Sequence, residues 1–156
     1  HTRIVSSISN NKMAARVALC SAVMALYVIG VVIGEKSCTE GMDEETIELA
    51  KMLRDNCGEE SEVDMGLINK VNSGADLMPD PKLKCYMKCV METAGMLDNG
   101  DVDIEATLEL LPEPMRKKHE HIVRSCGSKR GADDCETAFN TQSCWQKMNK
   151  AEYCLI

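Results

Sequence analysis

The sequence predicts an all-α domain of six helices, and three observations lead to this prediction. Apolar residues recur at helical spacing, and no stretch sustains the period-two alternation of a half-buried strand. Clusters of Gly, Pro and Asp separate the helical stretches by only a few residues. The chain of 156 residues contains nine cysteines, eight of which follow a strongly apolar segment near the N-terminus. We therefore expect one compact, disulfide-stapled helical domain.

The first 34 residues differ from the rest of the chain in composition. Residues 1–12 are rich in Ser and Asn without any period, and we interpret them as a non-native or untranslated-region lead. Residues 13–34, "MAARVALCSAVMALYVIGVVIG", have a short basic start and then 18 uncharged residues, which is typical of a secretory signal peptide. A membrane anchor is the alternative, because an apolar segment of this length nearly spans a bilayer. The glycines within the segment and the single nearby positive charge favour the signal peptide, which leaves 35–156 as the mature domain.

Removal of residues 1–34 changes the net charge and the cysteine count. Three of the 18 basic residues lie in it (Arg3, Lys12 and Arg16), so 15 remain against all 25 acidic residues, a net formal charge of −10. Such an acidic surface argues against nucleic acid and anionic membranes as partners. Cys20 is also removed, and the eight remaining cysteines indicate a disulfide framework formed in an oxidising compartment.

Three helices are expected in the first half of the mature chain. Residues 42–57 have acidic side chains in the first turn and an apolar stripe made of Ile47, Ala50, Leu53 and Cys57. A shorter helix is expected over 62–74, where Gly74 ends it. A longer one is expected over 81–97, because Pro81 suits a first helical turn.

Three more helices are expected in the second half. Asp103 is placed to cap a helix over 104–111, and prolines then break and restart the chain for a helix over 114–125. The last helix is expected over 133–148. The intervening "DNGDVD" is predicted to be a turn and not a calcium loop, because Gly100 and Val102 stand where a calcium loop needs oxygen ligands.

The cysteine positions constrain how these helices are joined. Cys85 and Cys89 lie one turn apart on the same helical face, so two other elements can meet that face. Cys135 and Cys144 are 2.5 turns apart and should therefore bond to different partners. Eight cysteines allow about 105 connectivities, and spacing alone does not choose among them.

The spacing Cys57-x27-Cys85-x3-Cys89-x36-Cys126-x8-Cys135-x8-Cys144 resembles the six-cysteine signature of insect odorant-binding proteins. The short segments "KLKCYMKC", "DNGDV", "CETAF" and "CW" are similar to the pheromone-binding-related proteins of flies and mosquitoes. The resemblance covers 38–156 and implies six helices that enclose an apolar cavity. It also implies the bridges Cys57–Cys89, Cys85–Cys135 and Cys126–Cys144. Cys38 and Cys154 depart from the signature, and we predict that they form a fourth bridge; free thiols or intermolecular pairing are the alternatives.

The expected ligand-binding residues come from helical stripes and from the resemblance. Stripes such as Met115, His119, Ile122 and Val123 are, by pattern alone, more typical of plain core than of a pocket. In the family the matching positions line the cavity. The implied set is Met91, Ile104, Thr107, Leu108, Leu111, Met115, His119, Ile122, Val123, Trp145, Tyr153 and Leu155. His119 is expected to face inward and His121 outward. No metal or other cofactor is expected.

The C-terminal segment "EYCLI" resembles the tail that family members fold over the cavity. The resemblance implies that the terminal carboxylate of Ile156 is held by Arg54 and Tyr86. Protonation of a carboxylate at low pH removes a charge-assisted hydrogen bond, which suggests acid-triggered opening. A bridge at Cys154 would restrain such a movement.

The function expected from the resemblance is that of a secreted, extracellular carrier without enzymatic activity. It would bind small hydrophobic odorants or pheromones reversibly in sensillum lymph or another body fluid and deliver them to an odorant receptor. Homodimers are common among such proteins. An enzyme such as a phospholipase is disfavoured, because no His–Asp pair and no Gly-x-Ser-x-Gly motif is present. A secreted helical signalling protein without an internal ligand remains the alternative.

Overall fold

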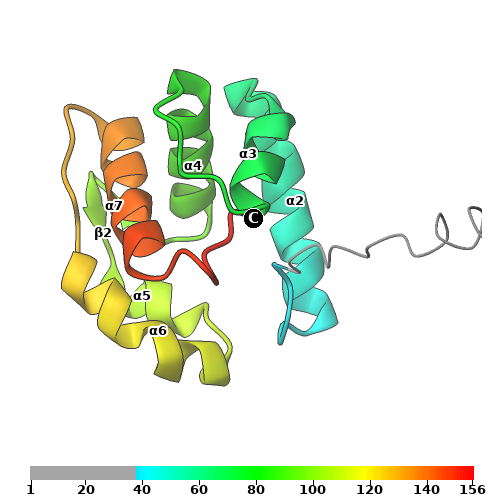
Figure 1. Ribbon diagram of the computed structural model, residues 1–156, viewed down its shortest axis with the longest axis vertical. Coiled ribbons are helices and arrows are strands. Elements are labelled where there is room, and N and C mark those ends of the chain that lie inside the picture. Colours follow the sequence, from blue (N-terminus) through cyan, green and yellow to red (C-terminus); the bar gives the residue numbers. More distant parts are fainter. Residues whose placement is uncertain (1–37) are drawn as a thin grey trace, which may run out of the picture. The chain divides into compact units, whose positions relative to one another are not determined.

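The computed structural model describes residues 38–156, and the predictions for the lead at 1–12 and the signal peptide at 13–34 lie outside this range. The described residues confirm the predicted all-α class with six helices (Figure 1). In chain order these are α2 (Glu44–Ser61), α3 (Met65–Asn72), α4 (Pro81–Thr93), α5 (Ile104–Glu109), α6 (Glu113–Cys126) and α7 (Asp134–Met148).

Most of these helices begin at an aspartate. Asp103 caps α5 as predicted, because its side chain accepts a hydrogen bond from the backbone N–H of Ala106 at 2.9 Å. The same arrangement begins α2, α3, α4 and α7, at Asp43, Asp64, Asp80 and Asp133. Helix α6 lacks a side-chain cap and starts after Pro112 instead. Local sequence therefore sets where five of the six described helices start.

Helix α4 is shorter than the predicted 81–97 because a glycine ends it. Gly95 has φ +72°, and the N–H groups of Gly95 and Met96 return to the carbonyls of Glu92 and Met91. This pair of bonds is the Schellman arrangement that closes many helices. The residues that follow form a small antiparallel hairpin, β1 (Leu97–Asp98) with β2 (Asp101–Val102). Its predicted turn holds Asn99 and Gly100, both with positive φ, as two-residue hairpin loops require.

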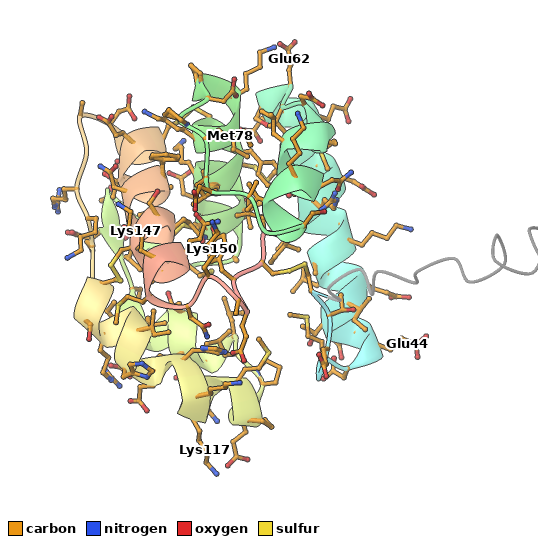
Figure 2. The ribbon with its side chains drawn as sticks, in the orientation of Figure 1. Glu44, Glu62, Met78, Lys117, Lys147 and Lys150 are labelled. Carbon is orange, nitrogen blue, oxygen red and sulfur yellow. A yellow bond between two sulfur atoms is a disulfide. The ribbon has the colours of Figure 1, made fainter. Side chains whose placement is uncertain are left out.

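Helix α4 lies at the centre of the described residues, with α7 on one side and α2 and α3 on the other (Figure 1). Its buried side chains include Leu83, Tyr86, Met87 and Met91, which form the middle of the core. The first-helix stripe is buried at Ala50, Leu53 and Cys57, whereas Ile47 remains 37% exposed in the first turns of α2. Charged side chains such as Glu44 and Lys117 point outward (Figure 2).

Within residues 38–156, four disulfides join the elements around α4. Cys57–Cys89 connects α2 to α4, and Cys85–Cys135 connects α4 to α7. Cys126–Cys144 connects the end of α6 to α7. Cys38–Cys154 joins the segment before α2 to the C-terminal tail. These are the pairs that the resemblance and the two additional cysteines led us to expect.

Gly131 precedes α7 at a close approach that only glycine permits. A methyl group there would lie 2.5 Å from Cβ of Glu136 and 2.8 Å from its backbone carbon. Gly131→Ala is therefore expected to lower the free energy of unfolding by about 2 kcal/mol, because the first turn of α7 has to shift. Guanidinium chloride unfolding with the disulfides intact measures this loss.

Gly95→Ala is the control for that substitution. A Cβ at Gly95 meets nothing within 4 Å, so only the left-handed backbone penalises alanine, at a cost of about 1 kcal/mol. Equal losses in the two variants would show that the contact with Glu136 does not matter.

Candidate ligand-binding cavity

A cavity of about 470 Å³ lies among α2, α4, α5, α6, α7 and the C-terminal tail. Its volume is in the range of known small-molecule sites. Most of the side chains that line it are apolar, and many are the thioethers of methionine. They include Met42, Met52, Met87, Met91, Met96 and Met115. Flexible thioethers adapt to ligands of varied apolar shape, so the cavity suits a non-covalent apolar guest.

The cavity brings together ten of the twelve residues expected to bind ligand: Met91, Thr107, Leu111, Met115, His119, Ile122, Val123, Trp145, Tyr153 and Leu155. Ile104 and Leu108 do not line it. They share one face of α5, where Leu108 is buried and Ile104 packs against the core. Thr107 on the adjacent face of α5, and Leu111 just after the helix, line the cavity. His121 is exposed and His119 faces inward.

The contribution of α2 was missed by the sequence reasoning. Leu49, Met52 and Asn56 line the cavity beside the expected stripe. Leu49 is 43% and Met52 54% exposed, and Leu110 across the cavity is 43% exposed. Because these residues both line the cavity and contact solvent, the cavity opens to the outside between α2 and the end of α5. Their spacing at i, i+3 and i+7 is the signal that could have revealed a second stripe on α2.

The C-terminal tail forms one wall of the cavity. Leu155 is 4% exposed, and the Asn72 side chain on α3 holds its backbone on both sides. Asn72 donates to the Leu155 carbonyl and accepts from the Leu155 N–H, each at 2.8 Å. The Tyr86 hydroxyl donates to the backbone oxygen of Ile156. Burial raises the pKa of Tyr86 to about 12, so this donor stays protonated at neutral pH.

Arg54 does not reach the tail directly in this arrangement. Its guanidinium donates to Oδ1 of Asn69 at 2.9 Å, and Asn69 lies on α3 near Asn72. Asn72 itself carried no sequence signal, because an asparagine on a short helix is usually a solvated side chain. The structure thus places Tyr86 against Ile156, whereas Arg54 contacts Asn69 on α3 and not the tail.

A small polar cluster lies at the edge of the cavity where α6 meets the tail. Nε2 of His119 is 3.3 Å from a carboxylate oxygen of Glu152, and Glu152 also pairs with Lys118 and accepts from Asn149. Burial lowers the pKa of His119; the charge of Glu152 opposes this change, and Lys118 and His121 reinforce it. The hydrogen bond from Lys118 lowers the pKa of Glu152.

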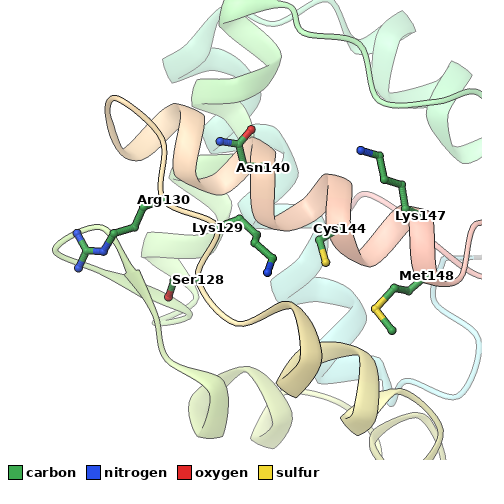
Figure 3. Close-up of a pocket in the computed structure, with 7 residues that line it drawn as sticks. All are labelled: Ser128, Lys129, Arg130, Asn140, Cys144, Lys147 and Met148. Atoms are coloured by element: carbon green, nitrogen blue, oxygen red, sulfur yellow. The ribbon is translucent and has the colours of Figure 1, made fainter.

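A second pocket of about 560 Å³ lies between α7 and the loop before it (Figure 3). It is lined by Ser128, Lys129, Arg130, Asn140, Cys144, Lys147 and Met148, so it carries cationic side chains and lies on a different side of α7 from the cavity. Arg130 pairs with Asp101 of the hairpin.

Over residues 38–156, the side chains show no cluster of His, Cys, Asp and Glu able to hold a metal ion. In the same range, no helix has the length and apolarity needed to cross a membrane.

Comparison with known proteins identifies the family. A model of the PBP/GOBP family matches residues 40–148, more than half of the chain, and the chain therefore belongs to that family. It is a family of odorant-binding carriers and not of enzymes. The chain is 33% identical to general odorant-binding protein 69a of Drosophila melanogaster over 104 residues, 66% of this chain and 70% of the relative.

Solved structures agree with this assignment. The medfly odorant-binding protein CcapOBP22/CcapOBP69a has 34% identity and a TM-score of 0.58, covering 64% of this chain and 87% of its own. The blowfly Phormia regina protein OBP56a, described as a fatty acid binding protein, has 29% identity and a TM-score of 0.56, covering 68% and 93%. The predicted odorant-binding family is confirmed.

The partly buried position of His119 leads to a prediction about pH. Its pKa is lower in the folded chain than the usual 6.5, so the unfolded chain takes up a proton first as pH falls. Stability is therefore expected to be complete above about pH 6.5 and to decline below it. His119→Gln should remove this part of the decline, as measured by denaturant unfolding at neutral and mildly acidic pH.

His121→Gln is the matched control, because His121 is two residues away and exposed. It should retain the pH dependence of the native chain. If His119→Gln and the native chain lose stability in parallel, other groups cause the decline.

Proposed function

We propose that this protein is an extracellular carrier that binds a small hydrophobic odorant or pheromone reversibly in the described cavity, without chemistry. The single observation that supports this most strongly is the apolar, methionine-rich lining of a cavity of about 470 Å³ with an open side. Burial of apolar surface supplies the affinity, roughly 25 cal/mol per Å² removed from water. The fatty acid binding described for the blowfly relative is consistent with an elongated apolar guest.

Carrier activity without catalysis is supported by the chemistry of the lining. The histidine of the cavity, His119, faces the carboxylate of Glu152, and Glu152 is already paired with Lys118. Such an arrangement holds the edge of the cavity together. It offers no nucleophile aligned with a general base, which hydrolytic chemistry needs.

The disulfides support the proposed extracellular site of action. Four bridges within residues 38–156 are expected of a protein that matures in an oxidising compartment. We infer that residues 13–34 act as a signal peptide and that residues 35–156 are secreted into sensillum lymph or another body fluid. There the carrier would deliver its ligand to an odorant receptor, as a monomer or as a homodimer.

The tail is proposed to act as a wall that controls access. Leu155 and Ile156 line the cavity and are held by Asn72 and Tyr86. Acid-triggered release through the terminal group of Ile156, with Arg54 contributing its charge nearby, is part of this proposal. The Cys38–Cys154 bridge limits how far such a release can extend.

Filling the cavity is the test of the carrier function. Ala50 lies on α2, is 7% exposed and lines the cavity, so Ala50→Trp should occupy the space that a ligand needs. Residues 35–156 titrated with a fluorescent apolar probe should bind about one probe per chain, with displacement by long-chain alcohols or esters. The variant should bind at least ten-fold more weakly while keeping its helical circular dichroism.

Ala75→Trp is the control, because Ala75 is exposed and lies outside the cavity lining. It should bind the probe as the native chain does. A native chain that is helical and fully bridged but binds no probe would favour the alternative, a signalling protein that acts through its surface.

The tail contact gives a separate prediction. Tyr86→Phe removes the hydrogen bond to Ile156 while keeping the buried ring, so probe dissociation should become about three- to ten-fold faster. Stopped-flow dilution measures this rate. Repeating it at pH 5 tests acid release: the native chain should then approach the rate of the variant. Equal native rates at neutral and acidic pH would remove acid release from the proposal.

A further inference from the structure

We propose that the side-chain amide of Gln142 is the hydrogen-bond donor of the cavity, and that the preferred guest is a neutral apolar molecule carrying one oxygen acceptor. This inference rests on the proposed carrier function and specifies the class of its ligand. It includes aldehydes, ketones, esters and alcohols, and it excludes carboxylates.

Gln142 faces the cavity from α7. Gln142, Trp145 and Asn149 are spaced at i, i+3 and i+7, and all three line the cavity. Asn140, two residues earlier and about 200° around the helix axis, lines the second pocket instead (Figure 3). The amides of Asn140 and Gln142 therefore point to different sides of α7.

The orientation of the Gln142 amide is set by Tyr153. The Tyr153 hydroxyl donates to Oε1 of Gln142 at 2.7 Å. Burial raises the pKa of Tyr153, so the phenol keeps its proton at physiological pH and remains a donor. The carbonyl oxygen of the amide is thus engaged by the protein. The Nε2 group, with two N–H donors, is left on the other side of the amide.

Nε2 of Gln142 is available to a guest. Among the described residues, no hydrogen-bond partner takes it. Within the same residues, the indole nitrogen of Trp145 is the only unpartnered side-chain N or O atom that is fully enclosed. Nε2 is therefore accessible, whereas a ligand oxygen would reach the indole N–H only after the ring moved.

Apart from the enclosed Trp145 indole, the other polar groups of the lining are engaged or lie at the rim. The Thr107 hydroxyl donates to the backbone of Asp103, and Asn149 donates to Glu152. Asn56 and Thr93 are exposed. Thr46, in the first turn of α2, is partly exposed, and its side chain hydrogen-bonds with the N-cap residue Asp43.

The charges of the lining argue for a neutral guest. Among the described residues the lining contains no Lys or Arg, and it contains the carboxylate of Glu152. His119 is already paired with that carboxylate. A carboxylate guest would leave water without gaining a cationic partner, which is costly in an apolar cavity. An aldehyde or ester loses far less hydration free energy on burial, and one hydrogen bond from the protein compensates for that loss.

The test compares guests of one chain length by displacement of a fluorescent apolar probe from residues 35–156 at pH 7.5. Dodecane, dodecanal, dodecanol and dodecanoate are the competitors. In Gln142→Leu/Tyr153→Phe, which removes both partners and leaves no buried hydroxyl unpaired, the affinity for dodecanal relative to dodecane should fall about five-fold. The affinity for dodecane itself should change less than two-fold. Dodecanoate should bind the native chain more weakly than dodecanal.

Tyr153→Phe alone probes the orientation. Without the phenol the amide is free to turn its oxygen towards the guest. Dodecanal, which only accepts, should then lose affinity, whereas dodecanol, which can also donate, should retain it. Asn140→Leu is the control, because Asn140 lines the second pocket, and it should leave the ratio of dodecanal to dodecane unchanged.

The outcomes separate this inference from the proposed function. An unchanged ratio in the double variant, or dodecanoate as the tightest guest, overturns the role of Gln142 while the carrier function stands. Failure of every competitor, dodecane included, to displace probe overturns both. If the double variant loses its helical signal, Gln142→Met provides the same comparison with a side chain of similar length.

Discussion

The pair of cysteines one helical turn apart on α4 is the constraint on which the rest of the structure depends. Cys89 holds α2 on one side and Cys85 holds α7 on the other, so three helices are joined covalently. A small helical domain normally gains its stability by filling its centre. Here part of the centre is a cavity, and each covalent link contributes roughly 3–4 kcal/mol in the chain-entropy model. Cross-links compensate for contacts that an open interior cannot provide.

The same arrangement explains why the core and the cavity share residues. Tyr86, Met87 and Met91 are buried between α2 and α7, and each also lines the cavity. The same stripe of α4 therefore packs in the core and also faces the ligand. A change that enlarges the cavity at one of these positions also removes core contacts, so specificity is more freely adjusted at the periphery of the cavity, from α2, α5 and α7.

Local sequence rules predict much of the fold, but they miss one helix end and the side chains that act through distant partners. Aspartate caps and prolines set the helix starts, which is why Asp103 was identified in advance. The end of α4 was placed too late because Gly95 was not weighed as a left-handed cap.

In the site, the stripe on α6 was visible in the sequence. Ile104 and Leu108 were not separable from Thr107 and Leu111, because a short apolar helix shows no preferred face until its neighbours are in place. Asn72 and Gln142 act through partners 83 and 11 residues away, which no periodicity can reveal.

The bridge between Cys38 and Cys154 makes the chain from its first described residue to the tail a closed covalent ring. On the C-terminal side of the bridge, Leu155 and Ile156 follow Cys154 and line the cavity. Two residues span at most about 7 Å when fully extended, so the bridge limits how far Leu155 and Ile156 can move from Cys154. A movement of this size can narrow or widen the cavity next to the tail, but it does not uncover the cavity as a whole. We therefore expect that, among guests of equal apolarity, the slender and flexible ones exchange fastest.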